Sequence, residues 1–197
     1  MASKEKVKKT VAQQIREWVV TFAVALVVVL AIRTFLCFMI RVDGVSMNNT
    51  LQDGEMLFYT AYDVRFGSVD RDEVVICHYP GRGLTYFVKR IVAVPGDTVY
   101  RENGVTHVVY EENGETIDEA LDEGTLYARL QTAYDYAPYT LGADEYFAVG
   151  DNRGNSHDSR DWNDDDDSKD VGPLHKRQIA GHVRFVVFPF SQIRTVK

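Results

Sequence analysis

One long apolar stretch near the N-terminus constrains this chain more than any other feature of its sequence. From residue 18 to residue 40, only Thr21, Arg33 and Thr34 are not apolar. A helix over 18–40 is about 35 Å long, enough to cross a bilayer core of about 30 Å. Arg33 would have to reach the interface or face a polar surface. The sequence therefore predicts a membrane-spanning helix over residues 18–40.

Two other structures are typical of such a stretch, a buried core helix and a cleaved signal peptide. The basic residues before the run fit a signal peptide, but no small-x-small cleavage motif follows it, where RTFLCFMIR stands instead. We therefore interpret the run as a retained anchor. Five basic residues precede it and two lie at its far end, which favours a cytoplasmic N-terminus. The expected division is a cytoplasmic tail over 1–17, an anchor over 18–40 and an extracytoplasmic domain over 41–197.

Charge separates the same two parts. Residues 1–41 carry a net charge of +5 and the whole chain −7, so that residues 42–197 carry −12. A body this acidic argues against nucleic acid as a partner, because phosphates bind basic surfaces. Cys37 in the apolar run and Cys77 in the body make a poor disulfide pair, so the fold does not depend on disulfides. Nothing in the sequence predicts the oligomeric state.

The body is predicted to be all-β and antiparallel. Short runs rich in β-branched and aromatic residues recur, separated by turn sequences such as PGRG, PGD, ENG and GDNRGN. The predicted strands are 73–79, 85–94, 106–110, 145–150 and 182–190.

Two acidic segments interrupt this pattern. A variable insertion is expected over about residues 100–144, and within it TIDEALDEG at 116–124 is long enough for one short helix. The run DWNDDDDSKD at 161–170 lacks the D-x-D-x-D-G spacing of an EF-hand loop, so we interpret it as a solvated loop and expect no metal.

Ser46 lies in GVSMNNTL, just beyond the predicted anchor. Serine is a weak nucleophile and needs a base to take its proton. The second glycine of a G-x-S-x-G nucleophile elbow is absent, since Asn48 stands there. Of the five histidines, only His157 lies among polar residues, and a triad of Ser46, His157 and an aspartate is one hypothesis for the base.

A lysine is the other candidate base. Lys89 lies inside the predicted strand TYFVKRIVAV, and strand alternation places it on one face and Arg90 on the other. One of these cations must project among apolar side chains. Burial disfavours a charged amine, and enzymes bring buried lysines to pKa values of about 7–8, suited to a general base. Arginine does not deprotonate, so the candidate is Lys89, whereas an edge lysine that reaches solvent is the alternative.

Five segments, in order, resemble the type I signal peptidases, membrane-anchored serine proteases with a Ser/Lys dyad. The first, 42–51, resembles a serine box in which S-M is followed by x-P-T-L, and 86–99 resembles the lysine box K-R-I-x-x-x-P-G-D. The third long match is 146–162, which resembles G-D-N-R-x-x-S-x-D-S-R. Residues 54–80 and 179–189 are similar to the two remaining boxes.

The resemblance implies roles for single residues. Ser46 corresponds to the nucleophile, Lys89 to the general base and Ser156 to the serine that orients this lysine. The supporting residues of the site then correspond to Asp158, Arg160, Asp151 and Gly44. The oxyanion would be held by the Ser46 amide; some members have a serine that helps at position 44, where this chain has Gly44.

The resemblance also implies an activity and a fold. It implies a coiled antiparallel β-sheet domain and a signal peptidase I activity without cofactor or metal. This activity cleaves signal peptides from secreted precursors after small residues at −1 and −3. The expected partners are such precursors and the lipid bilayer. A Ser/Lys protease dedicated to one substrate, such as a pilin or conjugation protein, and an inactive membrane-anchored binding module on the same fold are the alternatives. One departure concerns Asn49, where the family has a proline that would stiffen the loop.

Overall fold

A computed structural model describes residues 10–35, 38–79, 85–121, 135–162 and 171–196, and within 31–35 only the backbone. The chain divides into two compact units, residues 1–37 and 38–197. The acidic run predicted as a solvated loop lies outside the described residues from 163 to 170.

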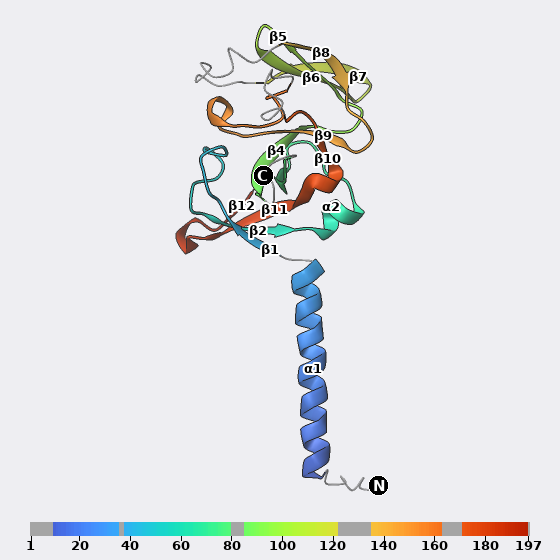
Figure 1. The fold of residues 1–197 in the computed structure, drawn as a ribbon, viewed down its shortest axis with the longest axis vertical. Coiled ribbons are helices and arrows are strands. Elements are labelled where there is room, and N and C mark those ends of the chain that lie inside the picture. The colour runs from blue at the N-terminus through green and yellow to red at the C-terminus, as the bar shows by residue number, and fades with distance from the viewer. Residues whose placement is uncertain (1–9, 36–37, 80–84, 122–134, 163–170, 197) are drawn as a thin grey trace. The chain divides into compact units, whose positions relative to one another are not determined.

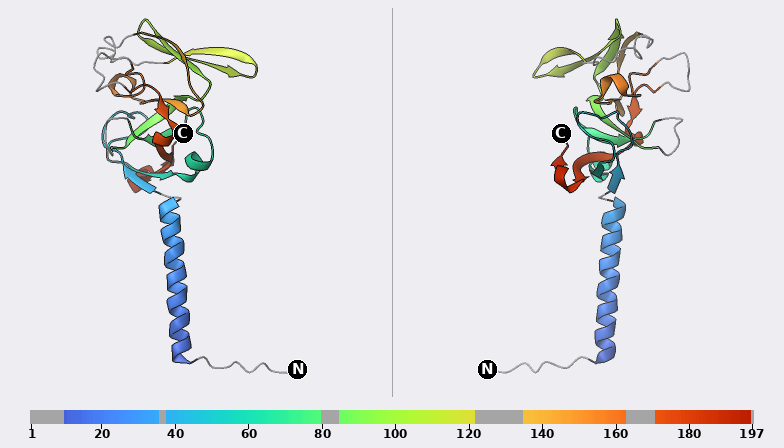
Figure 2. Two further views of the ribbon diagram at one scale, coloured as in Figure 1. Left: turned by 45° about the vertical axis from the view of Figure 1, so that its right-hand side comes forward. Right: turned by 90° about the vertical axis from the view of Figure 1, so that its left-hand side faces the viewer.

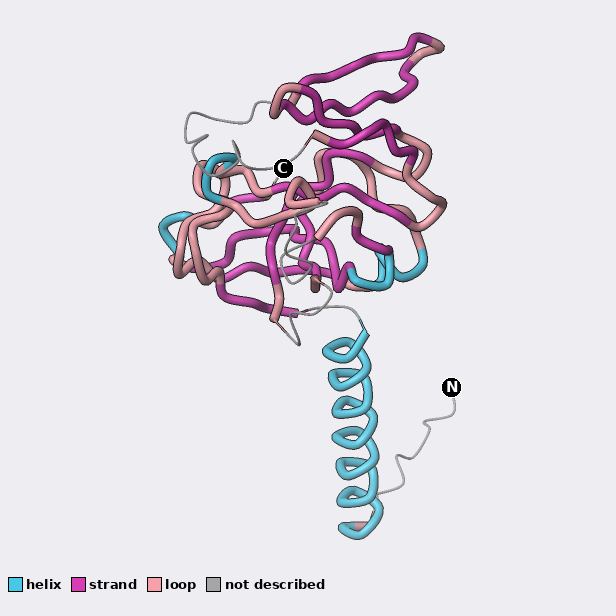
Figure 3. Tube along the Cα trace, turned by 45° about the horizontal axis from the view of Figure 1, so that its top comes forward, coloured by secondary structure: helices cyan, strands magenta, loops and turns pink. Residues whose placement is uncertain are grey.

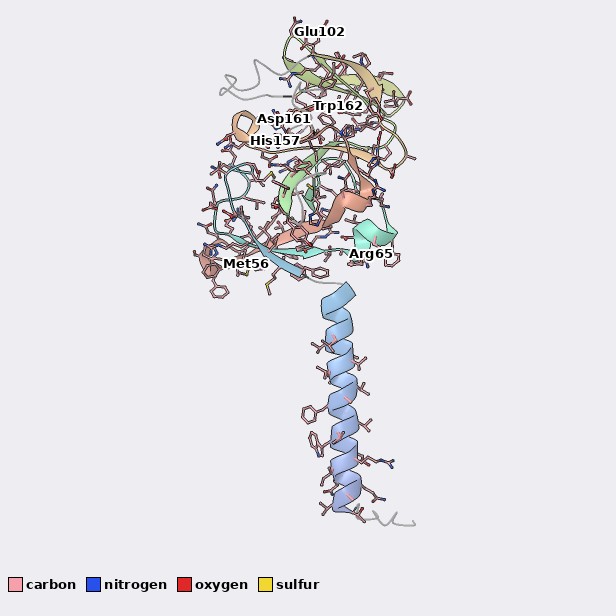
Figure 4. All side chains as sticks on the ribbon, viewed as in Figure 1. Met56, Arg65, Glu102, His157, Asp161 and Trp162 are labelled. Atoms are coloured by element: carbon pink, nitrogen blue, oxygen red, sulfur yellow. The ribbon has the colours of Figure 1, made fainter. Side chains whose placement is uncertain are left out.

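The first unit contains the helix α1 (Val11–Phe35). Thr10 and Gln13 form a capping box, in which each side chain bonds the other residue's backbone N–H, at 3.0 and 3.3 Å. These bonds start the helix seven residues before the predicted 18–40 segment. Its end also differs, because Phe38–Arg41 form a strand. The described side chains of α1 are exposed, and by length and composition the helix can cross a membrane (Figure 4).

The second unit is built mostly of antiparallel strands, as predicted (Figure 3). Its larger sheet has the order β1-β2-β11-β3-β4-β9-β10, with β12 pairing along β11. The strands are β1 (Phe38–Arg41), β2 (Met56–Thr60), β3 (Val74–Cys77), β4 (Phe87–Ala93), β9 (Glu145–Val149), β10 (Leu174–His175), β11 (Ile179–Phe188) and β12 (Arg194–Thr195). A short helix, α2 (Tyr62–Phe66), follows β2.

The smaller sheet comes from the predicted insertion. It has the order β7-β6-β5-β8, formed by β5 (Thr98–Glu102), β6 (Val105–Glu112), β7 (Glu115–Ala120) and β8 (Tyr136–Thr140). The short helix predicted at 116–124 is wrong over its described part, because the Asn113–Gly114 turn returns the chain antiparallel to β6. Figures 1 and 2 show this sheet at the end of the domain away from β1, β2 and β12.

Three clusters of buried side chains fill the domain. One lies between β1, β2, β3 and β11, another between β3, β4, β9 and the segment around α2, and the third joins β4 and β9 to the smaller sheet. The strand β4 borders all three, because a register shift between Ile91 and Ala93 turns its end toward the smaller sheet. This position puts the middle of β4, where Lys89 lies, deep inside the domain.

Glycine is required where β11 begins to pair with the end of β2. A Cβ on Gly181 would lie 2.4 Å from the Tyr59 ring and 2.5 Å from the Thr60 carbonyl oxygen, closer than any real contact. We expect Gly181→Ala to destabilise the domain by about 3 kcal/mol, because the two strands would have to separate. Urea unfolding of the full chain in detergent measures the change. As a control, Gly114→Ala adds a methyl group in open space at positive φ, and should cost only about 1 kcal/mol. Equal costs for the two variants would contradict the close approach of β2 to Gly181.

Candidate active site

Ser46 lies on a loop that is anchored by the two buried residues Met47 and Leu51. The loop connects β1 to β2 and turns tightly, since the Leu51 N–H donates to the Met47 carbonyl at 2.8 Å. Met47 is 1% exposed and Leu51 is fully buried, both in the cluster under β2 and β3. Ser46 itself is half-buried. Burial of its neighbours therefore fixes the backbone of Ser46 while its own side chain stays near the surface.

Lys89 is buried on β4. Burial is what the hypothesis of a lysine base requires. Its side chain is 1% exposed, and its Nζ donates to the Ser156 Oγ at 3.0 Å. Burial lowers the pKa of the Lys89 amine, although the nearby Asp158 carboxylate acts in the opposite direction. The alternative of an edge lysine that reaches solvent is therefore wrong for this chain.

Gly150 brings the serine loop and Ser156 together. A Cβ at Gly150 would lie 2.5 Å from the Ser46 carbonyl oxygen and 2.2 Å from the Ser156 Oγ, so these two atoms are close neighbours across the glycine. Because Ser156 also touches Lys89, the two ends of the predicted dyad border the same small region. Sequence reasoning missed this glycine, although the turn signal G-D-N marks its position.

The turn after Gly150 is bonded along the serine loop. The Asn152 backbone N–H donates to the Ser46 carbonyl and its side-chain amide to the Val45 carbonyl, each at 2.9 Å. The Asp151 N–H donates to the Met47 Sδ at 3.4 Å. Three consecutive residues of the loop are thus held by two residues of the turn.

Asp158 and Arg160 form a fully buried ion pair beneath this turn. Asp158 accepts from the Arg160 Nε and Nη2, each at 2.9 Å, and from the Gly150 N–H at 2.9 Å. Burial alone would raise the pKa of Asp158, but the Arg160 guanidinium and the Gly150 amide hold it well below its usual range. Arg160 also donates to the Arg153 carbonyl at 2.8 Å, so the pair fixes both ends of the turn.

Asp151 joins the serine loop to the lysine strand. It accepts from the Arg90 Nε and Nη2 at 2.8 and 2.7 Å, and from the Thr50 Oγ1 at 2.5 Å. Burial opposes the ionised form, but these donors lower the pKa of Asp151. Arg90 and Thr50 were not predicted as site residues. Strand alternation was the available signal for Arg90, because it placed that residue on the face opposite Lys89.

The other two predicted groups, Gly44 and His157, have partners of their own. The Gly44 N–H donates to the Asp53 Oδ1 at 2.9 Å, so this amide is already engaged. The His157 Nδ1 lies 2.5 Å from the carboxylate of Asp161, four residues further on (Figure 4). Ser156 is therefore in contact with Lys89, while the ring of His157 is paired with a carboxylate on its own turn.

Comparison with known proteins identifies the family of this chain. The family described as signal peptidase, peptidase S26, matches residues 15–188. A signal peptidase I of Bacillus amyloliquefaciens is 34% identical over 98% of both chains, and one of Bacillus licheniformis is 35% identical over 90% of this chain and 91% of that protein. The chain belongs to the signal peptidase S26 family. It is a serine endopeptidase, and its curated relatives share nearly its whole length.

Two further similarities extend the comparison. Signal peptidase I S of Bacillus subtilis is 33% identical over 92% of this chain and 94% of that protein. A crystal structure of a signal peptidase I from Enterococcus faecalis covers 58% of this chain and 96% of that chain, with a TM-score of 0.37 and 21% identity. The family assignment follows from the sequence matches alone.

The signal peptidase serine box departs from its pattern at Asn49. This residue has φ +91°, which a proline ring, fixed near −65°, cannot adopt. A proline at this position would therefore require a different backbone conformation. Asparagine tolerates positive φ better than most residues.

We expect Asn49→Pro to lower kcat/KM by about 10²-fold, because the ring would move the loop that carries Ser46. Asn49→Gly is the matched control, since glycine adopts positive φ without strain and should retain nearly the parent rate. Cleavage of a precursor by both variants in detergent measures the effect. A proline variant as active as the parent would contradict the loop conformation described above.

Proposed function

We propose that Ser46 is the nucleophile of this signal peptidase and Lys89 its general base. The observation that supports the pair best is the burial of Lys89 against Ser156, which itself lies beside the Ser46 carbonyl across Gly150. A neutral lysine has two N–H bonds and one lone pair. With one N–H directed to the Ser156 hydroxyl, the lone pair is free to accept the Ser46 proton. Ser156 is thus proposed to orient the base.

With this pair, the proposed reaction has two stages. The Ser46 Oγ attacks the carbonyl carbon of the scissile peptide, and its proton moves to the Lys89 Nζ. The protonated amine then gives that proton to the leaving nitrogen, so that the mature protein departs and an ester to Ser46 remains. Lys89 next takes a proton from water, whose oxygen attacks the ester. The signal peptide leaves as a carboxylic acid, which loses its proton to solvent, and the proton held by Lys89 returns to the Ser46 oxygen.

The supporting residues hold this arrangement in place. Asp158 and Arg160 fix the turn that carries Ser156, and Asp151 ties Arg90, the neighbour of the base, to Thr50. The tetrahedral oxyanion is assigned to the Ser46 amide, since the Gly44 amide donates to Asp53. The role proposed for Gly44 is therefore to allow the turn at φ +115° rather than to bind the oxyanion.

The substrates of a signal peptidase are precursors that carry signal peptides. We propose cleavage after small residues at −1 and −3, with the substrate extended along a strand edge. The relatives compared above are named signal peptidase I, which favours this general activity. No observation favours the dedicated protease or the inactive binding module.

Mutation of the dyad tests this assignment. Ser46→Ala and Lys89→Ala should each reduce cleavage of a precursor ending in Ala-x-Ala at least about 10²–10⁴-fold, whereas His157→Ala should not. In the parent, kcat/KM should rise with pH through an apparent pKa below the ordinary lysine value of about 10.4, because only the neutral amine accepts a proton. Loss of activity in His157→Ala, with Lys89→Ala still active, would refute the dyad.

An N-terminal apolar helix and signal peptidase I relatives indicate a membrane-anchored protein. We propose that the N-terminus is cytoplasmic and that the β-rich domain, with its insertion of about 100–144, is extracytoplasmic, as the basic residues before the anchor favour. The anchor is assigned within α1. The predicted bounds, a tail over 1–17 and an anchor over 18–40, therefore move toward the N-terminus, because α1 begins at Val11 and ends at Phe35.

Contact with the lipid bilayer is supported by an exposed apolar face on the first strands. Met39 pairs with Phe58 across β1 and β2, and Phe58 with Phe185 across β2 and β11. Met39 is 68% exposed and Phe185 43%, while the opposite face packs on the core. An antiparallel sheet normally presents polar residues to water. Since β1 begins three residues after α1 ends in the chain, we assign this face to lipid.

Lipid contact is testable in vesicles with the full chain. Met39→Trp and Phe185→Trp should each add fluorescence that brominated lipids quench, beyond the background of Trp18 and Trp162. Tyr139→Trp, an exposed position on the smaller sheet, should add fluorescence that they do not quench. Equal quenching at all three positions would contradict the assignment of this face.

A further inference from the structure

The loop that carries Ser46 is held on a second side, by the last strand of the domain. Arg194 of β12 donates from its Nη2 to the Thr50 carbonyl oxygen at 2.7 Å. Thr50 also donates from its side chain to Asp151, so this one residue is held both from the Gly150 turn and from the C-terminal strand. The family match ends at residue 188, and Arg194 lies beyond it.

Glu55 completes the second contact. Both of its carboxylate oxygens accept from Arg194, at 2.7 and 2.9 Å, and one also accepts from the Gln52 N–H at 2.9 Å. The Glu55 carbonyl accepts from the Val42 N–H at 2.8 Å, at the point where the loop leaves β1. A single guanidinium therefore bonds the middle of the loop directly and its end through Glu55.

Arg194 reaches this position from a well-fixed backbone. It pairs with Val186 of β11, and the next residue but one, Val196, donates its N–H to the Arg184 carbonyl at 3.0 Å. Val196 also packs against the cluster that contains Met47 and Leu51. The C-terminal strand thus contacts the serine loop through both a charged side chain and the core beneath it.

The Glu55 side chain is 2% exposed and that of Arg194 is 37% exposed, so the carboxylate of the pair is buried although the arginine reaches the surface. Burial would raise the pKa of Glu55, but the hydrogen bonds from Arg194 hold it below its usual value. Removing the guanidinium would leave a buried carboxylate without its charged partner, which is strongly destabilising in proteins. Lysine is a poor replacement, because three hydrogen bonds on two groups use the planar fork of arginine.

We propose that Arg194 is a positioning residue of the peptidase reaction, which sets the placement of Ser46 by holding Thr50 and Glu55. The inference rests on the proposed role of Ser46 as nucleophile. It predicts that the last strand determines the rate of the chemical step, through the loop rather than through substrate contact. Losses should therefore appear in kcat, with KM close to the parent value.

The test uses the full chain in detergent, with precursor cleavage and thermal unfolding measured side by side. Arg194→Gln should lower kcat about 10–100-fold with little change in KM, because small displacements of a nucleophile have effects of this size. Arg194→Lys should retain an intermediate rate. Arg184→Gln is the matched control: it breaks the Arg184–Asp63 ion pair elsewhere on the same sheet and should lower stability while leaving kcat unchanged.

A double variant separates positioning from stability. In Glu55→Gln combined with Arg194→Gln the buried carboxylate is gone, so thermal stability should recover, but the bond to the Thr50 carbonyl is still missing and kcat should stay low. Recovery of kcat together with stability, or an unchanged kcat in Arg194→Gln, would overturn the proposal. Ser46→Ala in the same assay keeps the two proposals apart: an active Ser46→Ala enzyme refutes the proposed nucleophile, whereas an inactive one beside a fully active Arg194→Gln refutes only the positioning role.

Discussion

The burial of one amine determines how the rest of this domain must be built. Lys89 lies where water cannot solvate it, and its charged form is disfavoured for that reason. A buried polar group needs hydrogen-bond partners, and Ser156 supplies one. Ser156 in turn needs a fixed backbone, which the buried Asp158–Arg160 pair provides. Each layer of the site thus satisfies a requirement that the layer inside it creates.

The placement of ionic groups follows the same logic. Asp158 is close enough to Lys89 to favour its protonated form, which would defeat a general base. Arg160 donates two hydrogen bonds to the same carboxylate, and its positive charge acts to lower the pKa of Lys89. The neighbouring Arg90, on the opposite face of β4, is neutralised separately by Asp151. The pKa of Lys89 is therefore lowered even though ionic groups surround it.

Much of the fold and of the candidate site could be predicted from the sequence, because these parts depend on local patterns. The alternation in β4 separated Lys89 from Arg90, and the turn sequences and apolar runs marked five strands of the larger and smaller sheets. The ends of α1 could not be predicted from hydropathy, since the capping box of Thr10 and Gln13 extends the helix beyond the apolar run. The strand β7 was mistaken for a helix because its acidic residues have little strand propensity, and pairing with β6 decides its structure.

The contacts between distant segments were beyond local patterns. Thr50, Gly150 and Arg194 meet around one loop although Gly150 lies 100 positions and Arg194 lies 144 positions after Thr50. In its local sequence each residue has an ordinary interpretation: a loop threonine, a turn glycine and an exposed basic residue. Only the sheet order brings them together. Residues of this kind become visible when the three-dimensional arrangement is known.

The place of β11 in the larger sheet has a consequence for the order in which the domain can form. It lies between β2 and β3, so among the described strands of this sheet β1 and β2 pair with the others through β11, which follows β3, β4 and β9 in the sequence. Pairings between such distant segments form slowly, because closing long loops costs entropy before any contact is gained. As the ribosome releases the chain, the loop that carries Ser46 emerges before β11, the strand that joins β2 to the rest of its sheet. The loop that carries Ser46 therefore gains its full sheet support only after β11 has been made.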